Sequence, residues 1–403
     1  MKIQAQKGTK DILPAQITNW YKMEDTAREV FTLAGCSEIR TPIFEATELF
    51  ARGVGDSTDI VNKEMYTFEK AERSLTLRPE NTAGVVRAYI ENGFSRVTPP
   101  VKLWYKGPMF RYERPQAGRQ RQFHQVGVEI FGSPEPSCDA EAINLAVTYL
   151  NKLGFNHLKV ELNSLGCPEC RKVYREKIRE VLVKHLNELC DDCKLRYEKN
   201  PLRILDCKNE HCQEILANDD VQAVINADFI CDECKTHFTD VQNYLDSLNI
   251  PYVVNKLLVR GLDYYTRTVF EVKSEDLGAQ SAILGGGRYD GLVEMLGGTP
   301  TPAVGWALGM ERLYSLMSEQ SQEKLDYFVV SQNTPEALKL VQKLRNEGKS
   351  ADFDYSARKF AKQLEKASKI AKKAVILGDD EIAGGYYTVK NLETGEQVKA
   401  ESL

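Results

Sequence analysis

Arginines and carboxylates gather in one short segment of this 403-residue chain. The polar residues of the segment that could contact a ligand are Arg111, Glu113, Arg114, Gln116, Arg121, Gln125 and Glu129. Apolar runs flank them at Leu103–Phe110 and Phe123–Phe131, which predicts an antiparallel hairpin with a polar loop. A guanidinium group at the end of a strand can grip a phosphate through its planar fork, so the hairpin could bind a nucleotide triphosphate. The alternative is a surface hairpin whose charges are solvated.

An acid and a hydroxyl lie close together at Glu80 and Thr82, beside the turn that Pro79 fixes. Such a pair could hold the ammonium group of a ligand. The alternative is the capped start of a helix, because Thr82 precedes the run Ala83–Ala88. This segment alone does not decide between the two.

Three segments in the second half of the chain combine arginine, tyrosine and glycine. Arg260 follows an apolar run and precedes a glycine, so it could approach a phosphate or carboxylate closely. Tyr264-Tyr265 could wall a flat ligand. The run Gly285-Gly286-Gly287 before Tyr289 has no side chains, so its backbone could lie against a ligand. Small residues lead into a helix that carries Arg312, and the sequence contains neither a P-loop nor a strand followed by GxGxxG.

Eight of the ten cysteines fall between residues 167 and 234. They are Cys167, Cys170, Cys190, Cys193, Cys207, Cys212, Cys231 and Cys234. Because no export signal is present, the thiols should stay reduced, which argues against disulfides. The pairs Cys167/Cys170 and Cys190/Cys193 have nineteen residues between them and predict a structural, tetrahedral zinc site, although eight thiols could hold two ions. The alternative is a set of free cysteines, some of them buried as small hydrophobes.

The composition is that of a folded soluble protein, with 28% charged and 42% hydrophobic residues. The net charge of −5 is wrong for a general nucleic-acid coating protein, so any RNA contact must come from local basic patches. The sequence has no run of about 18 apolar residues, and its first residues lack an apolar signal core. We therefore expect neither a membrane span nor secretion.

The pattern of apolar, charged and Cys-rich stretches divides the chain into four parts. The expected parts are residues 1–165, a Cys-rich insertion at 166–236, a return to the first domain at 237–319, and a C-terminal domain at 324–403. Asp25–Gly35 has helical spacing in the first part. Residues 320–323 are the expected linker.

The last part alternates strands and helices in a βαβα order, which predicts a small α/β domain. A helix is expected at Arg358–Lys373 and a strand at Ala374–Leu377. Lysines repeat on one face of this helix and apolar residues on the other. Seven basic residues against one acidic residue favour contact with phosphates. The alternative is an ordinary solvated helix face.

The order of these segments resembles the class II aminoacyl-tRNA synthetases, and among them the histidyl-tRNA synthetases, over nearly the full length. The similarity rests on three class motifs and on two loops specific to the histidine enzymes. The motifs correspond to Ile39–Glu45, Phe110–Glu129 and Gly305–Arg312, the loops to Arg260–Tyr265 and Gly286–Gly291, and a further match to Gly8–Pro14.

The resemblance implies an α/β (α+β) fold, in which an antiparallel-sheet catalytic domain carries the Cys-rich insertion and is followed by an α/β anticodon-binding domain. It implies a histidine–tRNA ligase that activates L-histidine with ATP and Mg²⁺ to histidyl-adenylate and transfers it to the 3′ end of tRNA(His). It also implies a cytoplasmic homodimer, because motif 1 forms the dimer interface of the class. The zinc prediction rests on cysteine spacing and not on the resemblance.

The resemblance assigns roles residue by residue. Catalytic roles fall to Arg111, Arg312 and Arg260, the last as a cation in place of a metal near the α-phosphate. The residues that would contact ATP or histidine are Glu80, Thr82, Arg111, Glu113, Arg121, Gln125, Glu129, Arg260, Tyr264, Tyr265, Gly287, Tyr289 and Arg312. Arg114 and Gln116 would meet the extra 5′ guanosine of histidine tRNA. Asn81 departs from the family, which more often has glycine there.

Two rival functions belong to other classes. One is a regulatory synthetase paralogue that partners ATP phosphoribosyltransferase in histidine biosynthesis. Such proteins typically lack the C-terminal domain and have altered catalytic positions, whereas this chain keeps Arg260 and its last domain. The other is a non-enzymatic RNA- or kinase-associated module, against which the intact set of arginines and glycines argues.

Overall fold

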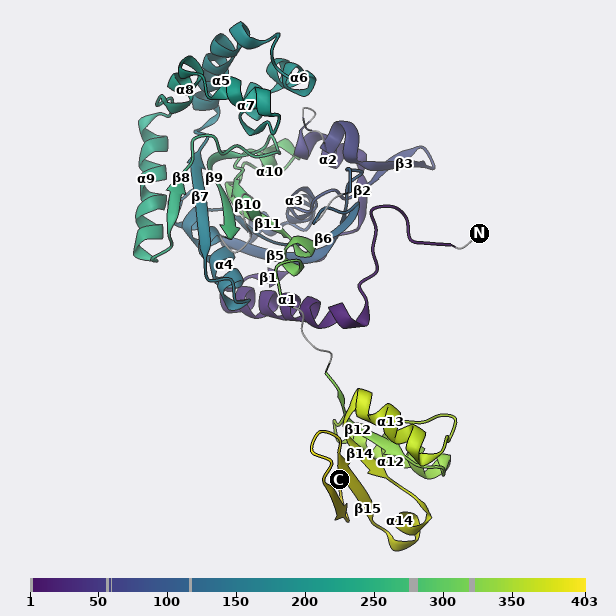
Figure 1. The fold of residues 1–403 in the computed structure, drawn as a ribbon. Coiled ribbons are helices and arrows are strands. Elements are labelled where there is room, and N and C mark those ends of the chain that lie inside the picture. The colour runs from purple at the N-terminus through teal and green to yellow at the C-terminus, as the bar shows by residue number, and fades with distance from the viewer. Residues whose placement is uncertain (1–2, 56–57, 59, 116–117, 275–281, 319–322) are drawn as a thin grey trace. The chain divides into compact units, whose positions relative to one another are not determined.

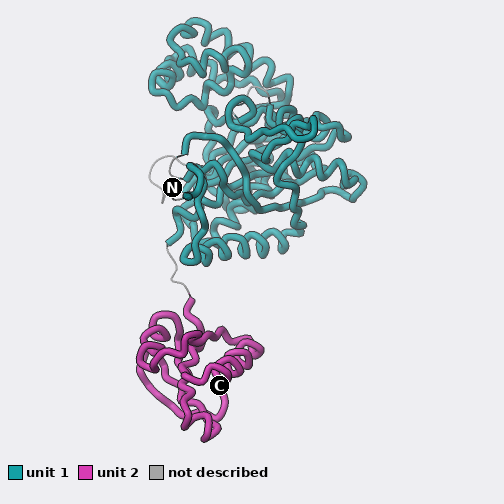
Figure 2. Tube along the Cα trace, turned by 90° about the vertical axis from the view of Figure 1, so that its right-hand side faces the viewer, with its two compact units in different colours: residues 1–319 teal, residues 320–403 magenta. Residues whose placement is uncertain are grey.

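The fold, drawn in Figure 1, is that of a computed structural model that describes residues 3–55, 58, 60–115, 118–274, 282–318 and 323–403. The chain forms two compact units, Met1–Glu319 and Gln320–Leu403, which Figure 2 colours separately. The first unit contains the arginine-rich segments and the Cys-rich insertion. The second is the small α/β domain. Most of the expected linker lies outside the described residues.

An eight-stranded sheet forms the centre of the first unit. In order across the sheet, its strands are β1 (Ser37–Glu38), β5 (Val101–Phe110), β6 (Gln122–Phe131), β11 (Ala303–Gly309), β10 (Ala282–Arg288), β9 (Thr266–Ser274), β7 (Leu158–Ser164) and β8 (Tyr252–Val254). From β5 to β7, each strand is antiparallel to its neighbours. The two short outer strands are parallel to theirs, β1 to β5 and β8 to β7. The expected antiparallel sheet and the hairpin of β5 and β6 are therefore confirmed.

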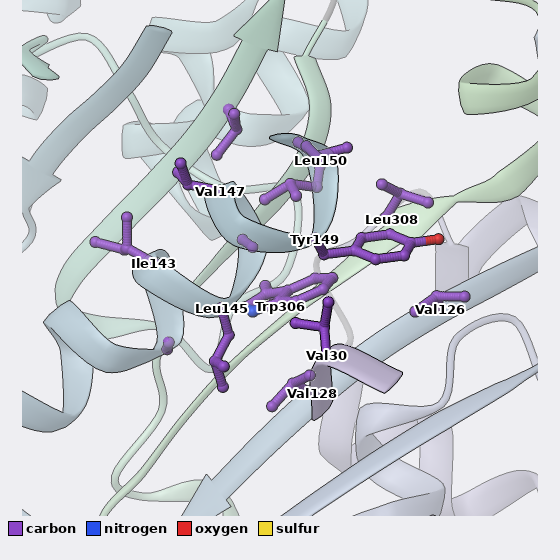
Figure 3. Close-up of a cluster of buried hydrophobic side chains, with 14 of the residues drawn as sticks. Val30, Val126, Val128, Ile143, Leu145, Val147, Tyr149, Leu150, Trp306 and Leu308 are labelled. Atoms are coloured by element: carbon purple, nitrogen blue, oxygen red, sulfur yellow. The ribbon is translucent and has the colours of Figure 1, made fainter. Parts of the chain in front are cut away.

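The two faces of this sheet carry different side chains, because successive residues of a strand point to opposite faces. On one face, Trp306 and Leu308 of β11 lie among side chains of α4 (Pro136–Lys152) and β6 (Figure 3). Helix α1 (Pro14–Leu33), which contains most of the helix predicted at Asp25–Gly35, contributes to the same core. The opposite face receives the alternate residues of these strands, which are Gln125, Gly127, Glu129, Gly305 and Ala307.

A smaller sheet and two helices border that opposite face. The sheet has the order β2 (Phe44–Ala46), β4 (Arg73–Leu77) and β3 (Tyr66–Lys70). Helix α2 (Thr47–Val54) packs on α3 (Thr82–Glu91), which starts one residue after Asn81.

The Cys-rich insertion is helical and buries its own apolar residues, which belong to the same hydrophobic cluster as α3 and β5. Its elements are α5 (Pro168–Leu182), α6 (Asp191–Lys199), the 3₁₀ segment η4 (Pro201–Asp206), α7 (Glu210–Leu216) and α8 (Asp219–Asn226). The chain then returns through α9 (Asp232–Ser247), which packs on α4 (Figure 1). The insertion therefore leaves the sheet after β7 and comes back to it before β8.

The C-terminal unit is a mixed five-stranded sheet with helices, which confirms the predicted α/β class. Its elements are β12 (Leu325–Val330), α12 (Thr334–Asn346), β13 (Ala351–Phe353), α13 (Phe360–Ile370), β14 (Ala371–Ile376), α14 (Asp379–Gly384), β15 (Tyr387–Asn391) and β16 (Gln397–Ala400). The helix predicted at Arg358–Lys373 ends three residues early, because Ala371–Ile376 pairs with β12 as a strand.

The lysine face of α13 is partly occupied by contacts of its own. Lys362 and Lys369 pair with Glu365 at 3.1 and 3.3 Å. The ammonium group of Lys366 lies 5.2 Å from the ring centroid of Phe328.

Among the described residues, no helix combines the length and the apolar character needed to cross a bilayer.

Candidate active site

A cavity of about 430 Å³ opens on the face of the large sheet opposite α1 and α4. The residues assigned to ligand binding that line it are Glu80, Thr82, Arg111, Glu113, Gln125, Arg260, Tyr264, Tyr265 and Arg312. They come from the segment between β5 and β6, from β6, from the start of α3 and the residues just before it, from the segment between β8 and β9, and from α11 (Met310–Tyr314). Segments far apart in the sequence thus meet in one space.

Two arginines that line the cavity are each held by a backbone carbonyl. Arg111 follows β5, and its Nε donates a hydrogen bond to the carbonyl of Pro79 at 2.8 Å. Arg312 lies on α11, and its Nη1 donates to the carbonyl of Ala282 at 2.6 Å. These bonds leave other guanidinium N–H groups of each side chain for a ligand.

Arg260 is held more tightly than the other two arginines. Its guanidinium forms an ion pair with Glu271 of β9 and lies 6.0 Å from the ring centroid of Tyr265. It also lies against Gly285, where a Cβ would overlap the guanidinium group. A glycine is therefore required at that point for the arginine to sit on the strand.

The opposite end of the cavity is built around a buried carboxylate, Glu129. It accepts hydrogen bonds from the hydroxyls of Thr82 at 2.7 Å, Tyr289 at 2.5 Å and Tyr105 at 3.3 Å. Burial raises the pKa of Glu129 to about 8, although the three hydroxyls act to lower it. A cationic ligand group would supply the positive charge that this end of the cavity lacks.

Glu80 caps the helix that follows it and also lines the cavity. Its carboxylate accepts backbone N–H bonds from Thr82 at 2.7 Å and Ala83 at 3.0 Å, so it caps the start of α3. Burial raises the pKa of Glu80, against the lowering effect of these two amides. Because the residue also lines the cavity, it adds a second acid beside Glu129.

Aromatic rings and an unpaired amide complete this end. The ring of Tyr264 lies 4.7 Å from that of Tyr265 and 5.5 Å from that of Tyr289, measured between centroids. The buried Oε1 of Gln125 has no hydrogen-bond partner within the part of the chain that the structure describes. A ligand donor at this oxygen would remove a cost of about 1–3 kcal/mol.

Some predicted residues lie behind or beside the cavity. Tyr289 and Glu129 form its buried backing. Gly287, with φ of +159°, lies against Thr268 and Tyr265, so only Gly285 of the glycine run lines the cavity. Of the three glycines, Gly285 is therefore the one whose backbone is placed to contact a ligand.

The two residues expected to meet tRNA belong to the loop between β5 and β6, of which Glu113, Gly118 and Arg119 line the cavity but Arg114 does not. Arg114 is exposed there, and Gln116 falls outside the described residues. Arg121 stacks over Tyr112 at 3.8 Å from the ring centroid and donates weakly to the carbonyl of Glu113 at 3.4 Å. Arg121, which was expected near the triphosphate, is thus held by residues of its own loop.

The sequence analysis did not assign several residues of the site, and three of them are instructive. Tyr105 is paired with Gly127 across the hairpin, so a tyrosine opposite a glycine was an available signal. Glu271 lies between Phe270 and Val272 in β9, so an acid between two buried apolar residues was an available signal. Arg203 comes from the insertion and lines the cavity, and nothing in its local sequence indicated this.

The eight clustered cysteines form two groups in space. One group is Cys167, Cys170, Cys231 and Cys234, and the other is Cys190, Cys193, Cys207 and Cys212. Within each group all Sγ atoms lie within 4.8 Å of one another, so each group could hold a metal ion. This differs from the single site predicted at Cys167, Cys170, Cys190 and Cys193. The two ends of the insertion meet at the sheet, and its first and last CxxC pairs therefore come together.

Comparisons with known proteins agree with this architecture. A family model described as histidyl-tRNA synthetase matches residues 8–313, and one described as anticodon binding domain matches residues 322–402. A histidine–tRNA ligase of Halothermothrix orenii is 50% identical over 409 residues, covering 99% of this chain and 97% of the relative.

Solved structures show the same relationship. The apo histidyl-tRNA synthetase of S. aureus has a TM-score of 0.82 at 38% identity and covers 99% of this chain and 97% of its own. A Bacillus halodurans protein described as an ATP phosphoribosyltransferase regulatory subunit/histidyl-tRNA synthetase has a TM-score of 0.68 at 21% identity, covers 94% of this chain and 99% of its own, and shares the fold. The chain belongs to the histidyl-tRNA synthetase family.

Proposed function

We propose that the protein is a histidine–tRNA ligase that forms histidyl-adenylate from histidine and ATP and transfers the histidyl group to tRNA(His). The observation that carries the proposal is the division of one cavity into two ends of opposite character. Three arginines, Arg111, Arg260 and Arg312, line the cavity together with Glu80, and Glu129 is buried behind Thr82. We call the surroundings of the arginines the arginine end and those of the two acids the acidic end. A zwitterionic amino acid and a polyanionic nucleotide fit these ends.

The acidic end would bind histidine. Its ammonium group would lie near Glu80, Thr82 and the unpaired oxygen of Gln125, with Glu129 behind them. The rings of Tyr264 and Tyr265 would flank its imidazole, with Tyr289 supporting them. Binding of the ammonium group would favour the ionised form of Glu129 and lower its pKa.

The arginine end would bind ATP, which enters with Mg²⁺ on its phosphates. Arg111 and Arg312 would hold the phosphates, and Glu113 would lie near the adenine. Arg260 would lie nearest the α-phosphorus, where its anchoring by Glu271 fixes its direction before the substrates arrive. Arg121 is a weaker candidate for phosphate contact because it lies over Tyr112.

The reaction then has two steps. A carboxylate oxygen of histidine forms a bond to the α-phosphorus while the bond to the bridging oxygen breaks, and pyrophosphate leaves with that electron pair. The negative charge that grows on the phosphoryl oxygens is stabilised by arginines that are already in place, so little reorganisation is needed. A ribose hydroxyl at the 3′ end of tRNA then attacks the adenylate carbonyl, and AMP leaves.

The match of residues 322–402 to the anticodon-binding model supports tRNA as the second substrate. The loop with Arg114 would approach the 5′ end of that tRNA. An enzyme that charges tRNA would act in the cytoplasm. The regulatory paralogue has only fold similarity in its favour.

A homodimer is proposed on the resemblance of motif 1 and on one surface feature. The segment around β2 exposes Ile43 by 43% and Phe44 by 54%, and Phe68 of β3 in the same small sheet is 42% exposed. Apolar side chains of this size on a sheet face suit contact with a second copy. Sedimentation equilibrium should give twice the 45.6 kDa chain mass, and a mass of one chain at micromolar concentration would contradict the dimer.

The test of the function is ATP–pyrophosphate exchange measured separately with each amino acid, without tRNA. Exchange with histidine alone supports the proposal. Histidine binding without any exchange would overturn it in favour of the regulatory paralogue. Aminoacylation of tRNA(His) with and without its extra 5′ guanosine then tests the second step.

A further inference from the structure

Each of the two groups of four cysteines in the insertion has the dimensions of a four-sulfur metal site. A tetrahedral shell with Zn–S bonds of about 2.3 Å places its sulfur atoms about 3.8 Å apart. The Sγ atoms of Cys167 and Cys170 are 3.5 Å apart, and those of Cys190 and Cys207 are 3.9 Å apart. None of the ten cysteines, all of which are described, forms a disulfide.

Backbone N–H groups donate hydrogen bonds to the sulfur atoms in both groups. The N–H of Cys167 donates to Sγ of Cys234 at 3.2 Å, and the N–H of Cys231 donates to Sγ of Cys170 at 3.1 Å. In the second group, the N–H of Cys190 donates to Sγ of the fourth cysteine, Cys212, at 3.3 Å. Neutral thiols packed as small hydrophobes would not need such donors.

Helix starts add to this effect. Cys167, Cys190 and Cys231 each precede the first residue of a helix, namely α5, α6 and α9. The N-terminal end of a helix favours a thiolate over a thiol. Cys231 is exposed, which is not the usual place for a structural apolar cysteine.

We propose that the insertion binds two structural Zn²⁺ ions, one at Cys167, Cys170, Cys231 and Cys234 and one at Cys190, Cys193, Cys207 and Cys212. Four soft thiolates match zinc, and a shell closed by four protein ligands leaves no position for substrate. The first ion joins the two ends of the insertion where they meet the sheet. The second joins α6, η4 and α7 within the insertion.

The first ion would also position the histidine-binding loop, a step that rests on the proposed function. Arg171 follows the ligand Cys170 directly. Its Nη1 donates to the carbonyl of Tyr265 at 2.6 Å and to that of Asp263 at 3.4 Å. The ion would thus fix the helix turn that holds Tyr265 at the cavity.

The second ion would act on the same loop from the other side. Between its ligands Cys193 and Cys207, the side chain of Asn200 donates to Oδ1 of Asp263 at 2.7 Å. Arg203, in the same stretch, lines the cavity. Both ions are therefore positioning elements that touch the site through Arg171, Asn200 and Arg203.

The test is metal content, which does not depend on histidine activation. Full-length protein purified without chelator should contain two zinc ions per chain by mass spectrometry of the metal. Titration with a mercurial should release one zinc for every four thiols that react. Protein reconstituted with Co²⁺ should show the intense visible and thiolate charge-transfer bands of tetrahedral sulfur sites. Absence of zinc, or iron in its place, would overturn the proposal.

Single variants test which cysteines belong together. Cys231→Ser and Cys212→Ser should each keep one zinc per chain, and the matched control Cys36→Ala, a buried cysteine outside both groups, should keep two. If the ligands were Cys167, Cys170, Cys190 and Cys193, Cys231→Ser and Cys212→Ser would lose no metal, and the pairing would be wrong. If a variant does not fold, the mercurial titration of the unaltered protein decides the stoichiometry. Zinc without histidine-dependent exchange would refute the function and leave the metal sites standing.

Discussion

The two ends of the cavity differ in how their charges are held. At the arginine end, Arg111 and Arg312 make single bonds to backbone carbonyls and keep other donors free. At the acidic end, Glu129 is fully buried and accepts three hydroxyl donors, and its pKa rises to about 8. Arg111 and Arg312 keep N–H groups for a ligand, whereas the acceptor atoms of Glu129 are already bonded within the protein and shielded from solvent.

The difference indicates a division of labour between nucleotide and amino acid. Guanidinium groups already in place stabilise the charge that grows on the phosphoryl oxygens, so they should affect the rate of the chemical step. A closed, hydrogen-bonded acid can recognise one small cation, so it should affect mainly the affinity for histidine. Substitutions at the two ends should therefore separate kcat from KM.

Replacing Arg260 should have the largest effect. Arg260→Ala should lower the turnover of histidine-dependent exchange by about 10²–10³-fold, because a fixed cation next to the reacting phosphorus is lost. Histidine binding, measured by calorimetry, should change far less. The matched control is Arg28→Ala, which removes an exposed arginine that pairs with Asp25 at 3.0 Å and should leave exchange unchanged. Turnover near that of the unaltered protein would show that Arg260 has been misassigned.

Moving Arg260 without removing it should come next. Gly285→Ala introduces a Cβ that overlaps the guanidinium, and a displacement of about 1 Å in a catalytic group can cost about 10²-fold. Gly291→Ala is the control, because a Cβ there meets nothing within 4 Å and the residue does not line the cavity. The measurement is turnover in exchange for both variants, with folding checked by circular dichroism. Equal activities would contradict the close fit of Arg260 on β10.

At the acidic end, Glu129→Gln should act on KM. The variant keeps the size of the side chain and removes its ability to ionise against the ammonium group of histidine. The KM for histidine should rise about tenfold, in line with about 1.5–3 kcal/mol for a hydrogen bond to a charged group. Turnover at saturating histidine should fall less than in Arg260→Ala. A loss confined to turnover, with KM unchanged, would contradict the claim that the acidic end acts mainly on the affinity for histidine.

The raised pKa of Glu129 also predicts how stability depends on pH. Between about pH 4.5 and pH 8, the folded protein keeps a proton on Glu129 that the unfolded chain has lost, so stability falls as pH rises, by about 1.4 kcal/mol per pH unit from this group. Glu129→Gln should remove this part of the slope. Urea denaturation of the ligand-free protein at pH 6 and pH 8 measures it. Parallel slopes for the two proteins would show that Glu129 is ionised in the folded state.

The smallest effect is expected where the insertion supports the loop. Arg171→Met keeps most of the side-chain volume and removes the bonds to the carbonyls of Asp263 and Tyr265. Because the loop retains the bond from Asn200, the KM for histidine should rise only about threefold, as for loss of one hydrogen bond of about 0.5–1 kcal/mol. Lys177→Met, on the exposed side of α5, is the control. An unchanged KM for histidine would show that Arg171 of the insertion does not support histidine binding.

Much of the fold follows from local patterns in the sequence. The apolar runs at Leu103–Phe110 and Phe123–Phe131, with the polar loop between them, were sufficient to predict the hairpin of β5 and β6. Helical spacing was sufficient for α1 but overran in α13, because Ala371–Lys373 has good helix propensity and becomes a strand only through its pairing with β12. Tertiary contacts of this kind are invisible in a window of neighbouring residues.

The site was predicted to the extent that its residues lie in distinctive motifs. Glu80, Arg111, Arg260 and Arg312 do, and the structure brings them to one cavity. Arg203 does not, because it reaches the cavity only through the path of the insertion. The cysteine pairing failed for the same reason, since spacing along the chain favours neighbours and the fold joins Cys167 to Cys234.

The most direct test of the divided cavity is a crystal structure of the protein with histidine, a non-hydrolysable ATP analogue and Mg²⁺. The account predicts both molecules in the cavity, with the ammonium group toward Glu80 and Glu129, the phosphates toward Arg111 and Arg312, and a carboxylate oxygen about 3–3.5 Å from the α-phosphorus beside Arg260. Histidine at the arginine end, or the two molecules in separate places, would contradict it.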